Sequence, residues 1–542
     1  MTIDRKISIL RKSNNLSQDD LAAILHVSRQ SLFKWEKGLA VPQTEKVVEL
    51  AKIFKVSIDD LINDDIEISN NSLNNTSNKY ESKYYATNGY RGEANINLTS
   101  DDAYKIGRFL GWYYCNPKYN KEALTQKPRI VIGKDTRRSS YMFEFALASG
   151  AASSGADVYM MHVTTTPSIG YIVNKEQFDC GVMITASHNH SYDNGIKLVT
   201  KDGELIDNNL LYLLESYLDN NLIPLDIKDN NDLPFAKRVD IGTINDYEEG
   251  RNKYIDYLTS ISKYSFRYLK VGLDTGNGAS YMIAKAVFEA LGAQLYVIND
   301  KPDGININYE SGSTHIEALS KLVKENKLDI GFAFDGDADR CIAVDENGDE
   351  VNGDKIIYLL ANKLKNNRAL NKNTVAVTEI SNTGLLKALN NNGIKTVITE
   401  VGDRNVLEKM IDGNYDLGGE QSGHILLRKY ASTSDGIIAS LLIVEEMIEK
   451  KQPLSKLVEP VKLVPQIVKT IELADKDSIL GNEDLLNKYN EIKENLGNKG
   501  RIILRASKTE PAVRIMVEHS DIARCNSYLS EMREVIEKII KQ

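Results

Sequence analysis

The stretch DIGFAFDGDADRCIAV, residues 329–344, is an apolar strand that ends in an acid-rich loop and returns as a second apolar strand. Two other stretches repeat its pattern of an acid, one residue and a glycine with a polar loop after them: DCGVMITASHN at 179–189 and DLGGEQSGHILL at 416–427. Strand-like runs and helical stretches precede each of them. This alternation is typical of a mainly parallel sheet covered on both faces. We therefore predict an α/β unit that occurs three times along the chain.

Composition indicates a globular protein of several domains. The chain has 542 residues, a net charge of -9, 42% apolar residues and 26% charged residues. A chain of this length is too long to fold around one hydrophobic core. Its negative net charge argues against a protein whose whole surface binds nucleic acid. The four cysteines have no paired spacing, no signal segment opens the chain, and no apolar run is long enough to span a membrane. We expect a cytoplasmic protein with reduced thiols and no membrane partner.

The acid loop predicts a divalent-metal site. Asp335, Asp337 and Asp339 alternate with small residues, so three carboxylates can converge, and hard cations prefer such oxygen ligands. A calcium EF-hand also begins with alternating aspartates, and Glu346 falls at its twelfth position. Arg340 occupies the position where that motif requires glycine, and strands flank the loop, so structural calcium is the less favoured alternative.

The serine loop predicts a phosphorylated nucleophile. Ser187 and His188 follow an apolar strand. A polar turn would be the ordinary interpretation, but phosphoserine adds charge and an oxygen ligand that suit the neighbouring acid loop. We expect Ser187 to complete the Mg²⁺ site, with Lys197 as general acid or base for a sugar hydroxyl.

Two further loops predict ligand contacts. Glu420, Ser422 and His424 offer a carboxylate, a hydroxyl and an imidazole among glycines, which suits hydrogen bonds to a sugar better than zinc. Near the C-terminus, cations and hydroxyls follow another apolar strand. Guanidinium groups recognise phosphate through paired hydrogen bonds, so we expect a phosphate clamp; a basic surface hairpin is the alternative. The residues of this expected phosphate clamp, or phosphate loop, are Arg505, Ser507, Lys508, Thr509 and Arg514.

The first 64 residues predict a separate helical module. Ser17 and Ser28 are expected to cap short helices, and Leu32, Phe33 and Trp35 supply apolar surface. The motifs LSQDDLA at 16–22 and VSRQSLFKWEKG at 27–38 resemble the repressor-type (Cro/C1-like) helix-turn-helix family. The resemblance implies that the second helix of the motif enters the major groove of DNA. A small protein-docking bundle is the alternative. The DNA contacts expected from the resemblance are Gln18, Arg29, Gln30, Ser31 and Lys34.

Residues 80–542 resemble the α-D-phosphohexomutase family, on four motifs in the family's order. These are TASHN at 185–189, DGDADR at 335–340, GEQSGH at 419–424 and the phosphate loop. Gln421 and the turn at 401–404 resemble the phosphoglucosamine mutase branch. The resemblance implies interconversion of glucosamine 6-phosphate and glucosamine 1-phosphate through phosphorylated Ser187 and a 1,6-bisphosphate, with one Mg²⁺. It also implies catalytic roles for His188 and Arg91 and substrate contacts from Arg340, Asp403 and Arg404.

The implied fold is α/β: three similar mixed-sheet domains and a smaller α+β C-terminal domain around a central cleft, after a small all-α helix-turn-helix domain. A homodimer would pair two DNA-reading heads. The expected ranges are 1–64 for the DNA-binding domain, 65–79 for a flexible linker, 80–246 for the serine-loop domain, 247–365 for the metal-loop domain, 366–460 for the sugar-loop domain and 461–542 for the phosphate-loop domain.

Four positions depart from the family motifs: Asn88, His190, Lys508 and Ser434. The departures keep two alternatives open. One is phosphoglucomutase or phosphomannomutase activity. The other is a transcription regulator whose mutase-like body senses a phosphosugar with weak or no turnover.

Overall fold

The computed structural model divides the chain into two compact units, residues 1–82 and 83–542, and each is described by itself. The structure describes residues 3–13, 18–25, 27–37, 39–54, 61, 82–86, 89–204, 206, 208–225, 227, 232–473, 479–507 and 512–541. The expected linker at 65–79 lies outside these residues.

The first unit is a helical module built around one small core. Its helices are α1 (Ile3–Ser13), α2 (Gln18–Ile24), α3 (Arg29–Glu36) and α4 (Thr44–Phe54). The Ser28 hydroxyl accepts a hydrogen bond from the Ser31 amide and caps α3, as expected. Leu32 and Trp35 are buried in the core, but Phe33 is 45% exposed. Of the three apolar side chains expected on this helix, two therefore lie in the core and Phe33 adds apolar surface outside it.

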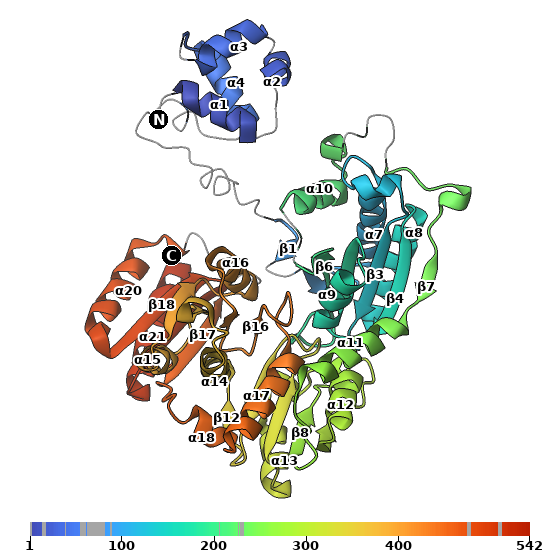
Figure 1. The fold of residues 1–542 in the computed structure, drawn as a ribbon. Coiled ribbons are helices and arrows are strands. Elements are labelled where there is room, and N and C mark those ends of the chain that lie inside the picture. Colours follow the sequence, from blue (N-terminus) through green and yellow to red (C-terminus); the bar gives the residue numbers. More distant parts are fainter. Residues whose placement is uncertain are drawn as a thin grey trace. The chain divides into compact units, whose positions relative to one another are not determined.

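The second unit begins with a seven-stranded sheet in the order β1-β2-β6-β5-β3-β4-β7 (Figure 1). Val131 and Met183 pack against α9 on one face, and α8 also packs on the sheet. The strands are β1 (Tyr85–Ala86), β2 (Gly89–Glu93), β3 (Arg129–Lys134), β4 (Asp157–Val163), β5 (Cys180–Ile184), β6 (Asp193–Thr200) and β7 (Ile244–Asp246). The helices are α7 (Ser100–Cys115), α8 (Arg138–Ser153), α9 (Thr166–Lys175), α10 (Asn208–Leu218) and α11 (Glu248–Ile261).

The second sheet has the order β12-β11-β10-β8-β9, and the third has the order β14-β13-β15-β16. The second contains β8 (Lys270–Asp274), β9 (Gln294–Ile298), β10 (Ile330–Phe334), β11 (Cys341–Val344) and β12 (Glu350–Val351), with α12 (Ser280–Ala290), α13 (Glu317–Asn326) and α14 (Gly353–Asn366). The third contains β13 (Thr374–Thr378), β14 (Lys395–Thr399), β15 (Leu417–Gly419) and β16 (Ile425–Leu427), with α15 (Thr383–Asn391), α16 (Asp403–Gly413), α17 (Gly436–Lys450) and α18 (Leu454–Val458).

The three sheets share one core arrangement, which confirms the predicted repeat. In each, one strand lies between two parallel partners: β3 in the first sheet, β8 in the second and β13 in the third. One of the two partners then pairs with an antiparallel strand that follows it directly in the chain. These antiparallel pairs are β5 with β6, β10 with β11, and β15 with β16. The serine, acid and sugar loops are the three connections within these pairs.

The repeated acid that starts each pattern has a structural role. Asp179 accepts a hydrogen bond from the backbone amide of Arg129, and Asp329 accepts one from the amide of Lys270. Asp416 accepts one from the amide of Asn371, just before β13. In all three copies the carboxylate therefore accepts a hydrogen bond from the backbone at, or just before, the start of a neighbouring strand, which is β3, β8 or β13.

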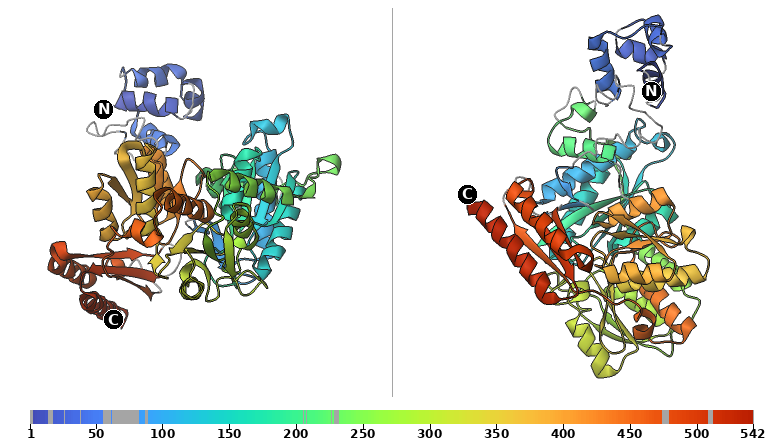
Figure 2. Two further views of the ribbon diagram at one scale, coloured as in Figure 1. Left: turned by 60° about the horizontal axis from the view of Figure 1, so that its bottom comes forward. Right: turned by 90° about the vertical axis from the view of Figure 1, so that its left-hand side faces the viewer.

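The C-terminal sheet is antiparallel, in the order β17-β19-β18. Its strands are β17 (Gln466–Glu472), β18 (Gly500–Ala506) and β19 (Ala512–His519). Val513, Ile515 and Val517 alternate along β19 and join one core with α20 (Glu483–Leu496) and α21 (Ile522–Lys541), so both helices pack on the same face (Figure 2). This matches the expected smaller α+β domain.

All four cysteines lie among the described residues and are free. In the part of the chain that the structure describes, no helix combines the length and the apolar character needed to cross a bilayer.

Candidate active site

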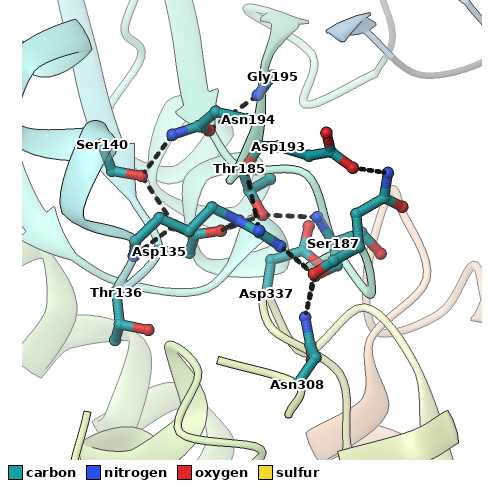
Figure 3. Close-up of polar contacts among 12 residues, drawn as sticks. Asp135, Thr136, Ser140, Thr185, Ser187, Asp193, Asn194, Gly195, Asn308 and Asp337 are labelled. Atoms are coloured by element: carbon teal, nitrogen blue, oxygen red, sulfur yellow. Dashed lines mark hydrogen bonds and ion pairs between the residues drawn. The ribbon is translucent and has the colours of Figure 1, made fainter. Parts of the chain in front are cut away.

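Ser187 lies directly after β5 with its side chain directed at the acid loop of the second sheet. Its hydroxyl donates to Asp335 Oδ2 over 2.6 Å. Its backbone amide donates to the Thr185 hydroxyl (Figure 3). The Ser187 backbone has φ +53°, the left-handed region that few residues other than glycine adopt. Residues 148 positions apart in sequence thus meet at one hydrogen bond.

The three aspartates converge as the sequence predicts. One oxygen from each of Asp335, Asp337 and Asp339 lies within 4.8 Å of the others, and all three are buried. Burial raises the pKa of Asp335 well above its usual value, and the carboxylates of Asp339 and Asp337 raise it further. Asp337 Oδ1 is buried without a hydrogen-bond partner among the described residues. Crowded oxygen donors with an unused lone pair fit a hard divalent cation such as Mg²⁺.

Lys197, on β6, lies against the same carboxylates. Its ammonium donates to Asp337 Oδ2 over 2.6 Å and to Asp339 Oδ2 over 2.9 Å. Burial opposes the charge, but Asp337 and Asp339 outweigh it and raise the pKa of Lys197 above its ordinary value. The ammonium is therefore charged and donates hydrogen bonds to both carboxylates.

The sugar loop adds an imidazole to the cluster. His424 Nδ1 lies 2.8 Å from Glu420 Oε2, and His424 Nε2 lies 3.1 Å from Asp339 Oδ1. Burial and Arg340 oppose a charge on His424, but the two carboxylates outweigh them and raise the pKa of His424 to about 10. A charged imidazole donates from both nitrogens, so Arg340 Nε, 3.1 Å from Nε2, is a like-charged neighbour and not a donor to it.

His188 has the opposite character. The positive charge of Arg340, together with burial and Arg91, lowers the pKa of His188 to about 2. Its Nδ1 lies 3.4 Å from Ser187 Oγ. His188 is therefore neutral and a weak base. For Arg91 itself, burial lowers the pKa, while Asp337 acts in the opposite direction.

Glycines allow these loops to approach closely. A Cβ atom on Gly336 would lie 2.6 Å from the Ser187 carbonyl oxygen, and one on Gly353 would lie 2.0 Å from the Glu420 carbonyl oxygen. At Gly436 the nearest atom would be the Arg340 carbonyl oxygen, at 2.4 Å. All three distances are shorter than real Cβ contacts, so the packing of the loops requires glycine at these positions.

Other predicted sugar contacts lie at the edge of this cluster. Asp403 begins α16, and the amide of the preceding Gly402 donates to Glu420 Oε1. Arg404 donates to Glu408 on the same helix, and Ser422 is exposed at the tip of its loop. The departure Ser434 is buried outside the left-handed region, so a serine fits there without backbone strain.

The phosphate loop is described in part. Arg505 and Arg514 are direct partners in the register of β18 and β19, so their side chains share one face of that sheet. Burial and the neighbouring Arg514 lower the pKa of Arg505. The Ser507 amide donates to the Ala512 carbonyl. Lys508, Thr509 and Asn88 lie outside the described residues.

Sequence reasoning missed Arg137 and Asn308, which hold the serine loop. Arg137 follows β3 directly and is fully buried, and Asn308 lies in the connection after β9. Asp135 and Arg137, an acid and a base two residues apart at the end of an apolar strand, were a signal for the first. No local signal marks Asn308.

In the first unit, the predicted DNA contacts gather on one surface. Gln18, Arg29, Gln30 and Lys34 line a groove of about 380 Å³, together with Phe33 and Leu39. The Gln18 amide also donates to Glu36, and the Ser31 hydroxyl bonds with that of Ser28. The groove therefore combines two cations, two amides and an exposed aromatic ring.

The chain matches five family models. Those described as phosphoglucomutase/phosphomannomutase alpha/beta/alpha domains I, II and III match residues 82–221, 252–348 and 352–464, and the C-terminal domain of the same family matches 469–535. A helix-turn-helix model matches 7–61.

Phosphoglucosamine mutases are among its relatives. That of Lachnospira eligens is 49% identical over 84% of this chain and 98% of the relative, and that of Lachnoclostridium phytofermentans is 47% identical with the same coverage.

Solved structures share the fold. A phosphoglucomutase/phosphomannomutase family protein of Burkholderia thailandensis superposes with a TM-score of 0.67 at 21% identity, over 84% of this chain and 97% of that one. An N-acetylphosphoglucosamine mutase of Aspergillus fumigatus, in complex with GlcNAc-6P and magnesium, gives 0.59 at 16% identity, over 84% and 95%.

Proposed function

Because this chain belongs to the phosphoglucomutase/phosphomannomutase family of isomerases and carries an N-terminal helix-turn-helix domain, we propose that it interconverts glucosamine 6-phosphate and glucosamine 1-phosphate. The observation that carries the proposal is the 2.6 Å contact between Ser187 Oγ and the buried aspartate cluster. The choice of glucosamine rests on the named relatives. Glucose and mannose phosphates are the alternative substrates.

We assign Mg²⁺ to Asp335, Asp337 and Asp339, with an oxygen of phosphorylated Ser187 as a fourth ligand. When bound, the cation neutralises charge on the transferring phosphoryl group. Three carboxylates and a phosphoserine carry a large negative charge in a small buried volume. Lys197 and His424, both hydrogen-bonded to the carboxylates, offset part of that charge.

The proposed reaction consists of two phosphoryl transfers, one from Ser187 to the sugar and one back to Ser187. Phosphoserine gives its phosphoryl group to the free hydroxyl of the hexose phosphate: the Ser187 Oγ–P bond breaks, an O–P bond to the sugar forms, and the proton lost by that hydroxyl is balanced by the one that Ser187 Oγ gains. The 1,6-bisphosphate then returns its other phosphoryl group to Ser187. Lys197 is the proposed general acid, because its protonated ammonium can give a proton to a leaving oxygen.

The remaining predicted residues are proposed to bind the substrate. The sugar hydroxyls meet Glu420 and Ser422, and His188 serves as a neutral partner beside Ser187. Guanidinium groups suit the phosphate that is not transferred. The proposed phosphate and sugar contacts are Arg91, Arg340, Asp403, Arg404, His424, Arg505, Ser507, Lys508, Thr509 and Arg514.

The test is a mass measurement together with a turnover assay. Purified protein is expected to carry one phosphate on Ser187, and to form glucosamine 1-phosphate from glucosamine 6-phosphate with Mg²⁺ and trace 1,6-bisphosphate. Ser187→Ala should abolish turnover, whereas Ser527→Ala, at a position on α21 that is exposed, should not. Absence of turnover on glucosamine, glucose and mannose phosphates alike would refute the proposal.

A second function is favoured by the surface of α3. We propose that the first unit binds DNA through Arg29, Gln30, Ser31 and Lys34, with Gln18 beside them, and that a homodimer pairs two such units. Full-length protein should then bind selected duplexes with a steep salt dependence. DNA binding that responds to sugar phosphate in a Ser187→Ala background would favour a sensing regulator. The domain boundaries and a cytoplasmic location stay predictions.

A further inference from the structure

Arg137 organises the serine loop around a single guanidinium group. Its Nη2 donates to the carbonyl oxygens of Ser187 and Asn189 over 2.9 and 3.0 Å. Its Nη1 donates to the carbonyls of His190 and Asp193. Four backbone carbonyls of the segment 187–193 therefore converge on one buried side chain.

Asp135 fixes that guanidinium in place. One carboxylate oxygen accepts from Arg137 Nε over 2.8 Å and from the Thr185 hydroxyl over 2.7 Å. The other accepts from the Ser140 hydroxyl and from the Arg137 amide. Figure 3 shows Asp135 between Ser140 and Thr185. Because the Thr185 hydroxyl in turn accepts from the Ser187 amide, the N–H of Ser187 is linked to Asp135 through Thr185, and the C=O of Ser187 is linked to it through Arg137.

Asn308 supplies a second clamp from the other side. Its side-chain amide donates to the carbonyl oxygens of Ser187 and Asn189 over 2.8 and 3.0 Å, the same two that Arg137 Nη2 contacts (Figure 3). Asn308 belongs to the part of the chain that builds the second sheet, which also carries Asp335. The clamp therefore ties the serine loop to the sheet that holds the acid loop.

The clamp contacts a residue, Ser187, whose backbone conformation is strained. With φ +53°, Ser187 is in a conformation that a free serine rarely adopts, and it persists only because the surroundings fix it. The backbone angle sets the direction of the Cα–Cβ bond and so the position of Oγ. If the Ser187 carbonyl were released, φ would return to negative values and Oγ would leave Asp335.

We propose that Arg137 and Asn308 are positioning residues that hold Ser187 in its left-handed conformation and thereby aim its oxygen at the aspartate cluster. This inference rests on the proposed phosphoryl role of Ser187. Neither side chain touches the reacting oxygen, so both act on the rate of phosphoryl transfer and not on the affinity for the sugar.

Asn308 offers the cleaner test, because it too has a positive φ, +57°, which glycine and aspartate tolerate. Asn308→Gly removes both donors without straining the backbone. Asn308→Asp turns a carboxylate, which cannot donate, toward two carbonyl oxygens. Asn220→Gly is the matched control, since Asn220 has φ +58° and is exposed after α10. Arg137→Lys keeps the charge but loses the planar fork of donors.

The measurements are kcat, KM for the hexose phosphate, the rate of Ser187 phosphorylation by the 1,6-bisphosphate, and the melting temperature. For Asn308→Gly we expect kcat and the phosphorylation rate to fall roughly 10- to 100-fold, because displacements of about 1 Å have effects of that size. KM should change little. For Asn308→Asp we expect kcat and the phosphorylation rate to fall further. For Asn220→Gly we expect both to equal those of the parent protein. Arg137→Lys should behave like Asn308→Asp if it folds.

Two outcomes overturn the inference alone: an Asn308→Gly protein with the parent's kcat and phosphorylation rate, or one in which only KM or the melting temperature changes. A parent protein that neither turns over nor accepts phosphate on Ser187 overturns the proposed function, and the inference with it. The four measurements therefore separate a failure of the clamp from a failure of the enzyme assignment.

Discussion

Gly336→Ala places one methyl group between the acid loop and the serine loop. The added Cβ would lie 2.6 Å from the Ser187 carbonyl oxygen, whereas ordinary van der Waals contact begins at 3.4 Å. The two loops must therefore separate by about 0.8 Å, the difference between these distances. Gly336 does not have a positive φ, so the methyl group acts through this contact and not through backbone strain.

The separation acts directly on the site. The Ser187 Oγ–Asp335 contact, now 2.6 Å, would lengthen beyond hydrogen-bond range if the whole displacement fell on it. We expect kcat to fall about 100-fold, the effect of misplacing reacting groups by about 1 Å, with a loss of ~1–3 kcal/mol of stability from overpacking.

The assay is steady-state turnover of glucosamine 6-phosphate at saturating Mg²⁺ and 1,6-bisphosphate, with melting temperatures to follow folding. Gly170→Ala is the control, because its Cβ would meet no atom closer than 3.3 Å. A Gly336→Ala protein that is folded and keeps kcat within about two-fold of the parent would refute the argument that the geometry of these two loops governs transfer.

Three further changes test other parts of the molecule. Asp335→Asn should raise the melting temperature of the metal-free protein, because it removes a crowded buried carboxylate. It should also reduce the rise in melting temperature that Mg²⁺ causes, and an unchanged rise would contradict the assigned metal site. Burial raises the pKa of Asp354 to about 7, so the native state holds a proton that the unfolded chain releases near pH 4, and stability is lost as pH rises from there through 7. Asp354→Asn should flatten that loss, worth up to ~4 kcal/mol, and parallel melting profiles between pH 4 and 8 would exclude it. Lys34→Ala should weaken DNA binding similarly on all duplexes and lower the salt slope by about 1, as fluorescence anisotropy would show.

Local sequence patterns were sufficient for the repeated sheets and their loops. Apolar runs such as 330–334 form buried strands, and the polar residues that follow them stand at the ends of parallel strands. Ser187 and Asp335 follow strands of different sheets, and their meeting was expected because a phosphoserine oxygen suits the metal site that the acid loop predicts.

Residues that act through long-range contacts escaped prediction. Arg137 and Asn308 bond to carbonyls 50 and 121 residues away, and a backbone acceptor leaves no mark in the sequence.

The catalytic loops all connect antiparallel neighbours, and this restricts how the family can vary. In a paired hairpin, one inserted residue shifts the register and turns every following side chain to the opposite face. An insertion in the connection between β10 and β11 would thus exchange the faces of Cys341 and Ala343 with those of Ile342 and Val344, all four of them buried, unless a bulge absorbed it. New substrate preferences are therefore expected to arise from substitutions in these connections. Insertions and deletions are expected in segments that do not join two antiparallel strands.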